Sequence, residues 1–266
     1  MRMVAGVNWK AFRLLLAAGL VGVIAVLPYA HALLESGTFG QVPQPAIPMP
    51  LILVLALVQN GILLAIAILA GMILSKRTGL RMPLIDAWAT GAPASIAEAG
   101  VWPGLLTGIA VGIAMVAIEA LVFLPYLPPS MESLFTIPLW KRLLGGVVYG
   151  GITEELFMRL FLMSWIAWIA GRWWKAADGR PAPGAFWIAI LVVAVLFGLG
   201  HLPATSAVTP LTTAIVVRAL VLNGVAGIAF GYLYWKRGLE AAMAAHVGAH
   251  LVLQIPGAML MARLTS

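Results

Sequence analysis

The sequence predicts an all-α fold, a bundle of about seven or eight membrane-spanning helices. Of the 266 residues, 62% are hydrophobic and only 9% are charged, whereas soluble domains carry about a quarter charged residues. Long apolar stretches recur along the chain and are separated by short basic loops. These observations exclude an ordinary soluble domain and indicate a polytopic membrane protein with a single membrane domain over residues 1–266.

Spanning a bilayer takes about 20 consecutive apolar residues. Stretches of suitable length and composition occur at residues 12–33, 51–74, 103–124, 140–170, 185–201, 211–235 and 239–261. The fifth stretch is short, and Asn223-Gly224 predicts a break of the sixth into two half-helices, which would give eight spans. For the first stretch, a cleaved signal peptide is an alternative, because Ala30-His31-Ala32 has the small-x-small spacing of a cleavage site.

Basic residues predict the orientation of the bundle. Eleven lysines and arginines flank the stretches on one side and three on the other. Since cytoplasmic loops are enriched in these residues, we expect a cytoplasmic N-terminus and location in the cytoplasmic (inner) membrane. This topology explains the net charge of +7. The sequence has no basic stripe with interleaved aromatic residues, so nucleic-acid binding is not indicated. Cysteine is absent, which excludes disulfides and thiolate metal sites.

Three charged residues interrupt the fourth stretch, in Glu-Glu-Leu-Phe-Met-Arg at residues 154–159. A charge at the bilayer centre costs about 2.5–3.5 kcal/mol on insertion scales, so such residues mark functional sites by default. Residues four apart share a helix face, and we therefore expect an ion pair between Glu155 and Arg159. Glu154 is rotated by about 100° from Glu155 and has no cation within the motif, which makes it the candidate general base. The alternative is a purely structural contact between helices.

Of the four histidines, three lie in apolar stretches. His201 ends the fifth stretch in Phe-Gly-Leu-Gly-His, where Phe197 lies on the same helix face. His246 and His250 lie four apart in the last stretch, among small and apolar residues, so they also share a face. This spacing suits catalysis, but it also suits a metal site, a proton relay or a hydrogen bond between helices.

Taken in order, Glu-Glu-x-x-x-Arg, then Phe-x-x-x-His about forty residues later, then a late His-x-x-x-polar pattern resemble the CPBP family of intramembrane endopeptidases, which includes the type II CAAX prenyl proteases. The resemblance covers a core at about residues 139–253. It implies hydrolysis of a peptide bond by water that a glutamate activates. Glu154 matches the catalytic glutamate, His201 the histidine that helps to activate water, and His246 the histidine that binds the substrate carbonyl or oxyanion.

One position departs from the family pattern, which has asparagine or sometimes aspartate where this chain has His250. A neutral histidine can donate one hydrogen bond to an oxyanion, as asparagine does. We expect no metal and no other cofactor, whereas a zinc-dependent variant of the enzyme would use the four catalytic candidates as ligands. The resemblance thus gives Glu154, His201, His246 and His250 as catalytic, and Glu155, Arg159 and Phe197 as supporting residues.

The expected partners are the lipid bilayer and a peptide or protein substrate that reaches a buried, hydrated cavity from the membrane. Simple alternation of the spans would place Glu154 and the histidines at different depths, so we expect irregular helices at the short fifth stretch and at Asn223-Gly224. Two other functions stay open. A proton-coupled transporter would depend on Glu119 and Arg218, buried charges that pair with each other or with the site. A catalytically inert family member would act as an immunity or partner-binding membrane protein.

Overall fold

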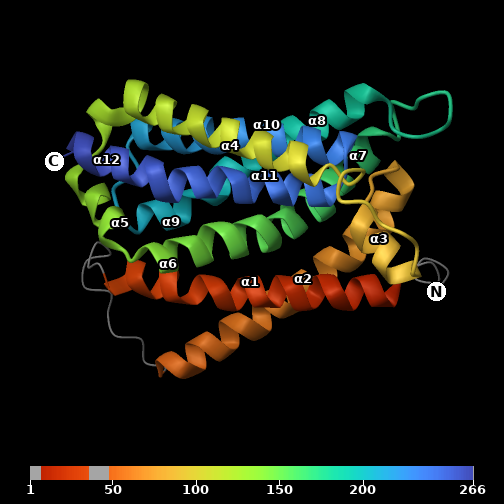
Figure 1. Ribbon diagram of the computed structural model, residues 1–266, viewed down its shortest axis with the longest axis horizontal. Coiled ribbons are helices and arrows are strands. Elements are labelled where there is room, and N and C mark those ends of the chain that lie inside the picture. Colours follow the sequence, from red (N-terminus) through yellow and green to blue (C-terminus); the bar gives the residue numbers. More distant parts are fainter. Residues whose placement is uncertain (1–6, 36–47, 266) are drawn as a thin grey trace.

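The computed structural model describes residues 7–35 and 48–265, and it contains helices but no β-strand within these two ranges (Figure 1). Among the described residues, six helices are long and apolar enough to cross a membrane. They are Trp9–Leu33, Val54–Thr78, Val101–Tyr126, Pro183–Ser206, Thr213–Lys236 and Leu239–Leu264. The predicted all-α membrane bundle is confirmed.

A further helical segment, residues 139–170, corresponds to the fourth predicted span. It is helical without interruption and comprises α6 (Leu139–Leu143), η4 (Leu144–Glu154), η5 (Leu156–Met163) and α7 (Ser164–Ala170). The parts η4 and η5 are π-helical, an uncommon conformation with i→i+5 hydrogen bonds that is frequent at functional sites. The residues of the charged motif lie at the junction of η4 and η5.

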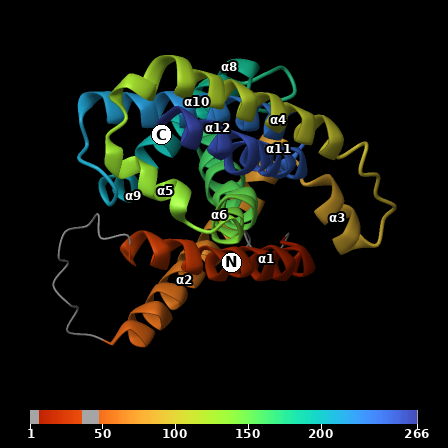
Figure 2. The same cartoon turned by 60° about the vertical axis from the view of Figure 1, so that its left-hand side comes forward.

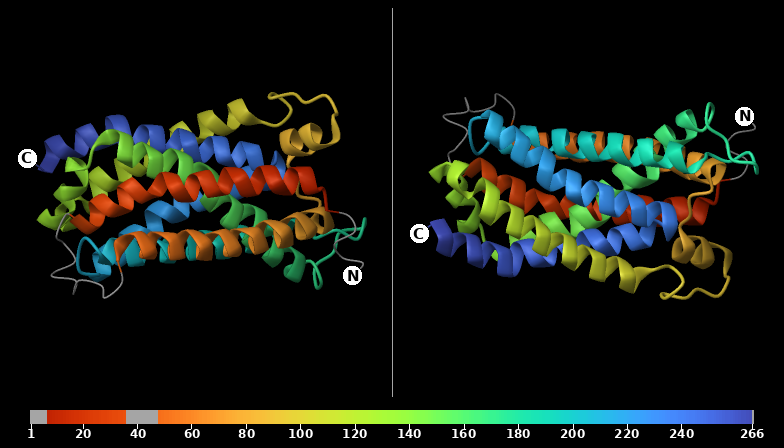
Figure 3. Two further views of the ribbon diagram at one scale, coloured as in Figure 1. Left: turned by 90° about the horizontal axis from the view of Figure 1, so that it is seen from below. Right: turned by 90° about the horizontal axis from the view of Figure 1, so that it is seen from above.

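Helices from before and after this segment in the chain lie alongside it (Figures 1 and 3). α1 (Trp9–Glu35) packs against η4 and α2 (Met49–Thr78) against η5, while α11 (Leu239–Val252) packs against η4 and also contacts α4 (Val101–Ile118) and α10 (Thr213–Lys236). Figure 2 shows that the beginning of α2 diverges from the bundle. The remaining elements are α3 (Pro83–Thr90), η1 (Glu119–Phe123), η2 (Leu124–Tyr126), η3 (Pro129–Glu132), α5 (Ser133–Thr136), α8 (Pro183–Gly200), α9 (Leu202–Ser206), η6 (Leu253–Gly257) and α12 (Ala258–Thr265).

Small residues allow α4 and α11 to pack closely. A β-carbon added at Gly108 would collide with the carbonyl oxygen of Ala245, and one added at Gly112 would lie 2.9 Å from that of Ala249. Glycine and alanine at intervals of four let membrane helices bring their backbones together. This packing fixes the position of α11, the helix that carries two of the candidate histidines.

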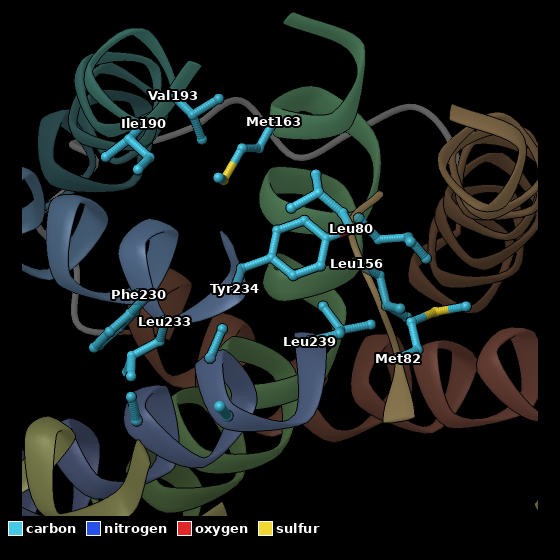
Figure 4. Close-up of a cluster of buried hydrophobic side chains, with 14 of the residues drawn as sticks. Leu80, Met82, Leu156, Met163, Ile190, Val193, Phe230, Leu233, Tyr234 and Leu239 are labelled. Carbon is cyan, nitrogen blue, oxygen red and sulfur yellow. The ribbon is translucent and has the colours of Figure 1, made fainter. Parts of the chain in front are cut away.

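A cluster of buried apolar side chains joins η5, α8, α10 and the segment after α2 (Figure 4). Its fully buried Tyr234 lies among them, and its hydroxyl is 3.0 Å from Oγ of Ser164. A buried tyrosine hydroxyl needs such a partner. The cluster therefore fixes η5 against α10 beside the charged motif.

The predicted break at Asn223-Gly224 is wrong, because α10 runs through both residues. Nδ2 of Asn223 donates to the carbonyl of Ala219 in the same helix, at 2.8 Å. A helical glycine costs only about 1 kcal/mol relative to alanine, whereas an opened helix would leave backbone groups unsatisfied in lipid at several kcal/mol each. Irregular helix geometry lies instead in the π-helical parts η1, η4, η5 and η6. At the end of the fifth stretch, where irregularity was also expected, α8 ends at Gly200 and α9 begins at Leu202, with a turn at His201 between them.

Candidate active site

Glu155 links two helical segments at the centre of the bundle. Its Oε1 lies 2.8 Å from Nδ1 of His246 on α11, and its Oε2 lies 3.3 Å from Nε of Arg159 on η5. The side chains of Glu155 and Arg159 are fully buried. The predicted pairing of Glu155 with Arg159 is confirmed, and the sequence did not reveal that His246 is the third member of the group.

Two aromatic rings hold the buried guanidinium of Arg159. Its Cζ lies 5.2 Å from the ring centre of Phe197 and 5.6 Å from that of Phe230, within the range of cation–π attraction. Within the described part of the chain, Nη1 and Nη2 of Arg159 have no hydrogen-bond partner. Phe197, Phe230 and Glu155 therefore fix this cation, and Phe230 is a supporting residue that the motif patterns did not identify.

Glu154 differs from its neighbour in both exposure and contacts. Its side chain is 22% exposed, and its Oε2 lies 3.7 Å from Nε2 of His246. The two adjacent glutamates thus face the two nitrogens of one imidazole ring. Glu155 is enclosed in protein, whereas Glu154 lines a cavity.

His201 is oriented by the end of its own helix. Its Nδ1 lies 2.8 Å from the carbonyl oxygen of Phe197. A carbonyl can only accept, so this bond places the proton on Nδ1 and leaves the lone pair of Nε2 free. The ring of Phe197 also meets those of His201 and His246 edge-on, with centres 4.7 and 5.9 Å away. Phe197 therefore contacts three of the predicted residues.

His246 and His250 form a stack, with ring centres 5.1 Å apart and planes at 11°. Glycines of η4 make room for these rings. A β-carbon at Gly150 would lie 2.8 Å from Nε2 of His246, and one at Gly146 would collide with the ring of His250. The glycines thus let the stacked rings lie directly against the backbone that carries Glu154.

A cavity of about 370 Å³ lies beside this group and is lined by Glu154, His201 and His250. His246 contacts Glu154 and His250 at its edge. The structure therefore brings all four predicted catalytic residues together. Polar side chains that the sequence did not assign to the site also line the cavity, namely Tyr29, Arg142, Tyr149 and Gln254.

A second cavity of about 440 Å³ adjoins the first, since Tyr29, Arg142, Arg218 and Gln254 line both. In its wall, Nε of Arg218 donates to both carboxylate oxygens of Glu119, at 2.9 and 2.8 Å. The two buried charges of η1 and α10 therefore pair with each other, which was one of the two arrangements expected for them.

The residues of the zinc alternative are close together but are not arranged as a ligand set. Within residues 7–35 and 48–265, no group of three or more His, Cys, Asp or Glu side chains could hold a metal ion as placed. Nδ1 of His201 and Nδ1 of His246 face the Phe197 carbonyl and Glu155, which leaves Nε2 of each ring as the nitrogen that could bind a metal. Since the side chains as placed form no such group, a shared metal would require them to move closer together.

Residues 135–252 match the family described as type II CAAX prenyl endopeptidase Rce1-like. The matched region contains Glu154, His201, His246 and His250, and the match confirms the resemblance to the CPBP family that the motifs predicted. No curated protein and no solved structure matches the chain.

Proposed function

We propose that Glu154 activates water for hydrolysis of a peptide bond, because residues 135–252 match the family described as type II CAAX prenyl endopeptidase Rce1-like and six helices among the described residues could cross a membrane. One observation carries this proposal. Glu154 lines the same cavity as His201 and His250 and lies 3.7 Å from Nε2 of His246. A general base, hydrogen-bond acceptors for water and donors for an oxyanion are thus available around one space.

The charges of the group balance if His246 carries a proton on each nitrogen. Nδ1 then donates to Glu155, and Nε2 faces Glu154 across 3.7 Å. Without the second proton, two acceptors would face each other. Two carboxylates, the Arg159 guanidinium and one imidazolium have no net charge, which lowers the cost of burying them together. We therefore assign His246 as an imidazolium in the active enzyme.

Catalysis begins with a water molecule that donates to Glu154 and to the free Nε2 of His201. Glu154 takes a proton from the water, and the resulting hydroxide adds to the carbonyl carbon of the substrate. The oxyanion accepts hydrogen bonds from Nε2–H of His246 and from His250. The tetrahedral intermediate then collapses as Glu154 returns its proton to the leaving amine, which yields a free amine and a carboxylic acid that ionises in water.

The substrate is a peptide or protein segment that enters the cavity from the membrane. Six helices among the described residues are long and apolar enough to cross a membrane, and the basic loops favour the cytoplasmic membrane with the N-terminus inside. This orientation predicts that a protease added outside sealed spheroplasts leaves an N-terminal tag intact. Removal of the tag under these conditions would contradict the topology.

Purified protein in proteoliposomes and a library of internally quenched peptides test the activity. The library includes farnesylated and unmodified versions of the same C-terminal tails. We expect the wild type to cleave peptide and Glu154→Gln to lose this cleavage. The control Glu98→Gln changes an exposed carboxylate that is distant from Glu154 in the sequence, and it should retain cleavage. Undiminished cleavage by Glu154→Gln would end the proposal, and a wild type that cleaves no peptide would favour an inert family member.

We also propose that the enzyme works without a metal. Protein treated with a chelator and then freed of it by gel filtration should retain its cleavage rate, with no stoichiometric metal by elemental analysis. Loss of activity that zinc restores would establish the metal-dependent mechanism instead.

A further inference from the structure

His250 is the one catalytic candidate that departs from the family pattern, and a chain of two hydrogen bonds determines which of its nitrogens carries the proton. Nη1 of Arg142 lies 3.5 Å from Oε1 of Gln254. Nε2 of Gln254 lies 3.5 Å from Nδ1 of His250. Both donor–acceptor distances are at the long end of the range for hydrogen bonds, as is common for catalytic hydrogen bonds in the absence of substrate.

The direction of this chain follows from chemistry. An arginine side chain has no acceptor, so it can only donate, and Gln254 must turn its carbonyl oxygen toward Arg142. The amide nitrogen of Gln254 then faces His250 and donates to Nδ1. In a neutral imidazole, a nitrogen that accepts carries no proton, so the proton of His250 lies on Nε2.

We propose that Arg142 and Gln254 are positioning residues that hold His250 in the Nε2–H tautomer and thereby make it a hydrogen-bond donor to the oxyanion. The inference rests on the proposed function. It explains how histidine replaces asparagine at this position, since an isolated imidazole could present either a donor or an acceptor. Gln254 lies four residues after His250 and is on the same helix face.

Gln254→Glu tests the proposal with little change in size. A carboxylate at this position still pairs with Arg142, but it accepts from Nδ1 of His250, moves the proton to that nitrogen and leaves Nε2 without one. Removal of one oxyanion donor costs about 10²–10³ in kcat. We therefore expect Gln254→Glu to lower kcat by up to about this factor, while KM changes little. The measurement uses the peptide of the library that the wild type cleaves fastest.

The double variant separates this effect from a structural one. An asparagine amide carries two N–H groups, so it donates to the oxyanion whatever acceptor stands beside it. In the His250→Asn background, Gln254→Glu should therefore leave kcat unchanged. A matched control is Asn223→Asp, which makes the same amide-to-carboxylate change in the adjoining cavity and should not alter kcat. Equal losses from Gln254→Glu with His250 or Asn at position 250 would overturn the proposal.

A spectroscopic measurement makes the test independent of activity. The chain has only four histidines, so ¹⁵N-histidine labelling gives few imidazole signals, and His250→Asn identifies those of His250. We expect a protonated Nε2 and an unprotonated Nδ1 in the wild type, and the reverse in Gln254→Glu. A proton on Nδ1 in the wild type would contradict the proposal even if Glu154→Gln abolishes cleavage, whereas an active Glu154→Gln would contradict the proposed function alone.

Discussion

Oε1 of Glu155 lies 2.8 Å from Nδ1 of His246, so the glutamate adjacent to the proposed base binds a histidine of another helix. The same carboxylate lies 3.3 Å from Nε of Arg159. This arrangement separates the functions of two neighbouring residues. Glu155 orients His246 from within the protein, and Glu154 faces the cavity on the other side of the ring.

Loss of Glu155 should destabilise the protein more than loss of the whole ion pair. Glu155→Gln leaves the buried Arg159 without a counter-charge, and breaking a buried pair costs about 3–5 kcal/mol. The double variant Glu155→Gln/Arg159→Met removes both charges and should regain part of that stability. Thermal unfolding in detergent measures both effects. Equal Tm values for Glu155→Gln and the wild type would show that the pair does not stabilise the fold.

Phe197 should be required for activity because it contacts Arg159, His201 and His246. Phe197→Leu removes the ring against which these groups are placed, and misplacement of catalytic groups can cost about 100-fold in rate. The control is Phe186→Leu on the same helix, which removes a ring stacked on Trp235. It should lower Tm but not the kcat of the folded enzyme. Equal effects of the two variants on kcat would contradict a specific role of Phe197.

Gly150 should tolerate no side chain. The β-carbon of Gly150→Ala would lie 2.8 Å from Nε2 of His246, so the ring must move away from Glu154, and we expect a loss of about 100-fold in kcat/KM. Gly224→Ala provides the comparison, because its β-carbon meets nothing within 4 Å. It should stabilise α10 by up to about 1 kcal/mol with full activity. An active Gly150→Ala would show that this close approach is not needed.

The Glu119–Arg218 pair should contribute to stability rather than to chemistry. Arg218→Met leaves Glu119 without its bidentate partner and should lower Tm, while kcat of the remaining folded enzyme stays near that of the wild type. Combining it with Glu119→Gln should recover part of the loss. A transporter would behave differently, since solute flux into proteoliposomes would then depend on this pair as strongly as on His201.

Residue spacing predicted the pairs that lie within one helix. Glu155 and Arg159 lie four apart, and their contact follows from helix geometry in either the α or the π form. The order of motifs likewise predicted which residues share the site, because Glu154, His201 and His250 line one cavity. The pairing of Glu119 with Arg218 was one of two expectations, and only the packing of η1 on α10 decided between them.

Other features depend on packing that a 3.6-residue period does not express. The glycine pairs 145–146 and 150–151 recur at an interval of five, which is the spacing of hydrogen-bonded residues in the π-helix η4 and not that of an α-helix. Arg142 lies beside Lys141 near the start of an apolar stretch, a position typical of a loop charge, yet it lines both cavities. The contact between Glu155 and His246 joins residues 91 positions apart, and no local pattern could have predicted it.

The central claim is that Glu154 is the general base. A comparison of peptide cleavage by the two single variants Glu154→Gln and Glu155→Gln tests it most directly. If Glu154 is the base, Glu154→Gln should lose cleavage while it keeps the wild-type Tm, since its carboxylate is partly exposed and borders the cavity. Glu155→Gln should lose stability as well as rate. Wild-type cleavage by folded Glu154→Gln would contradict the account.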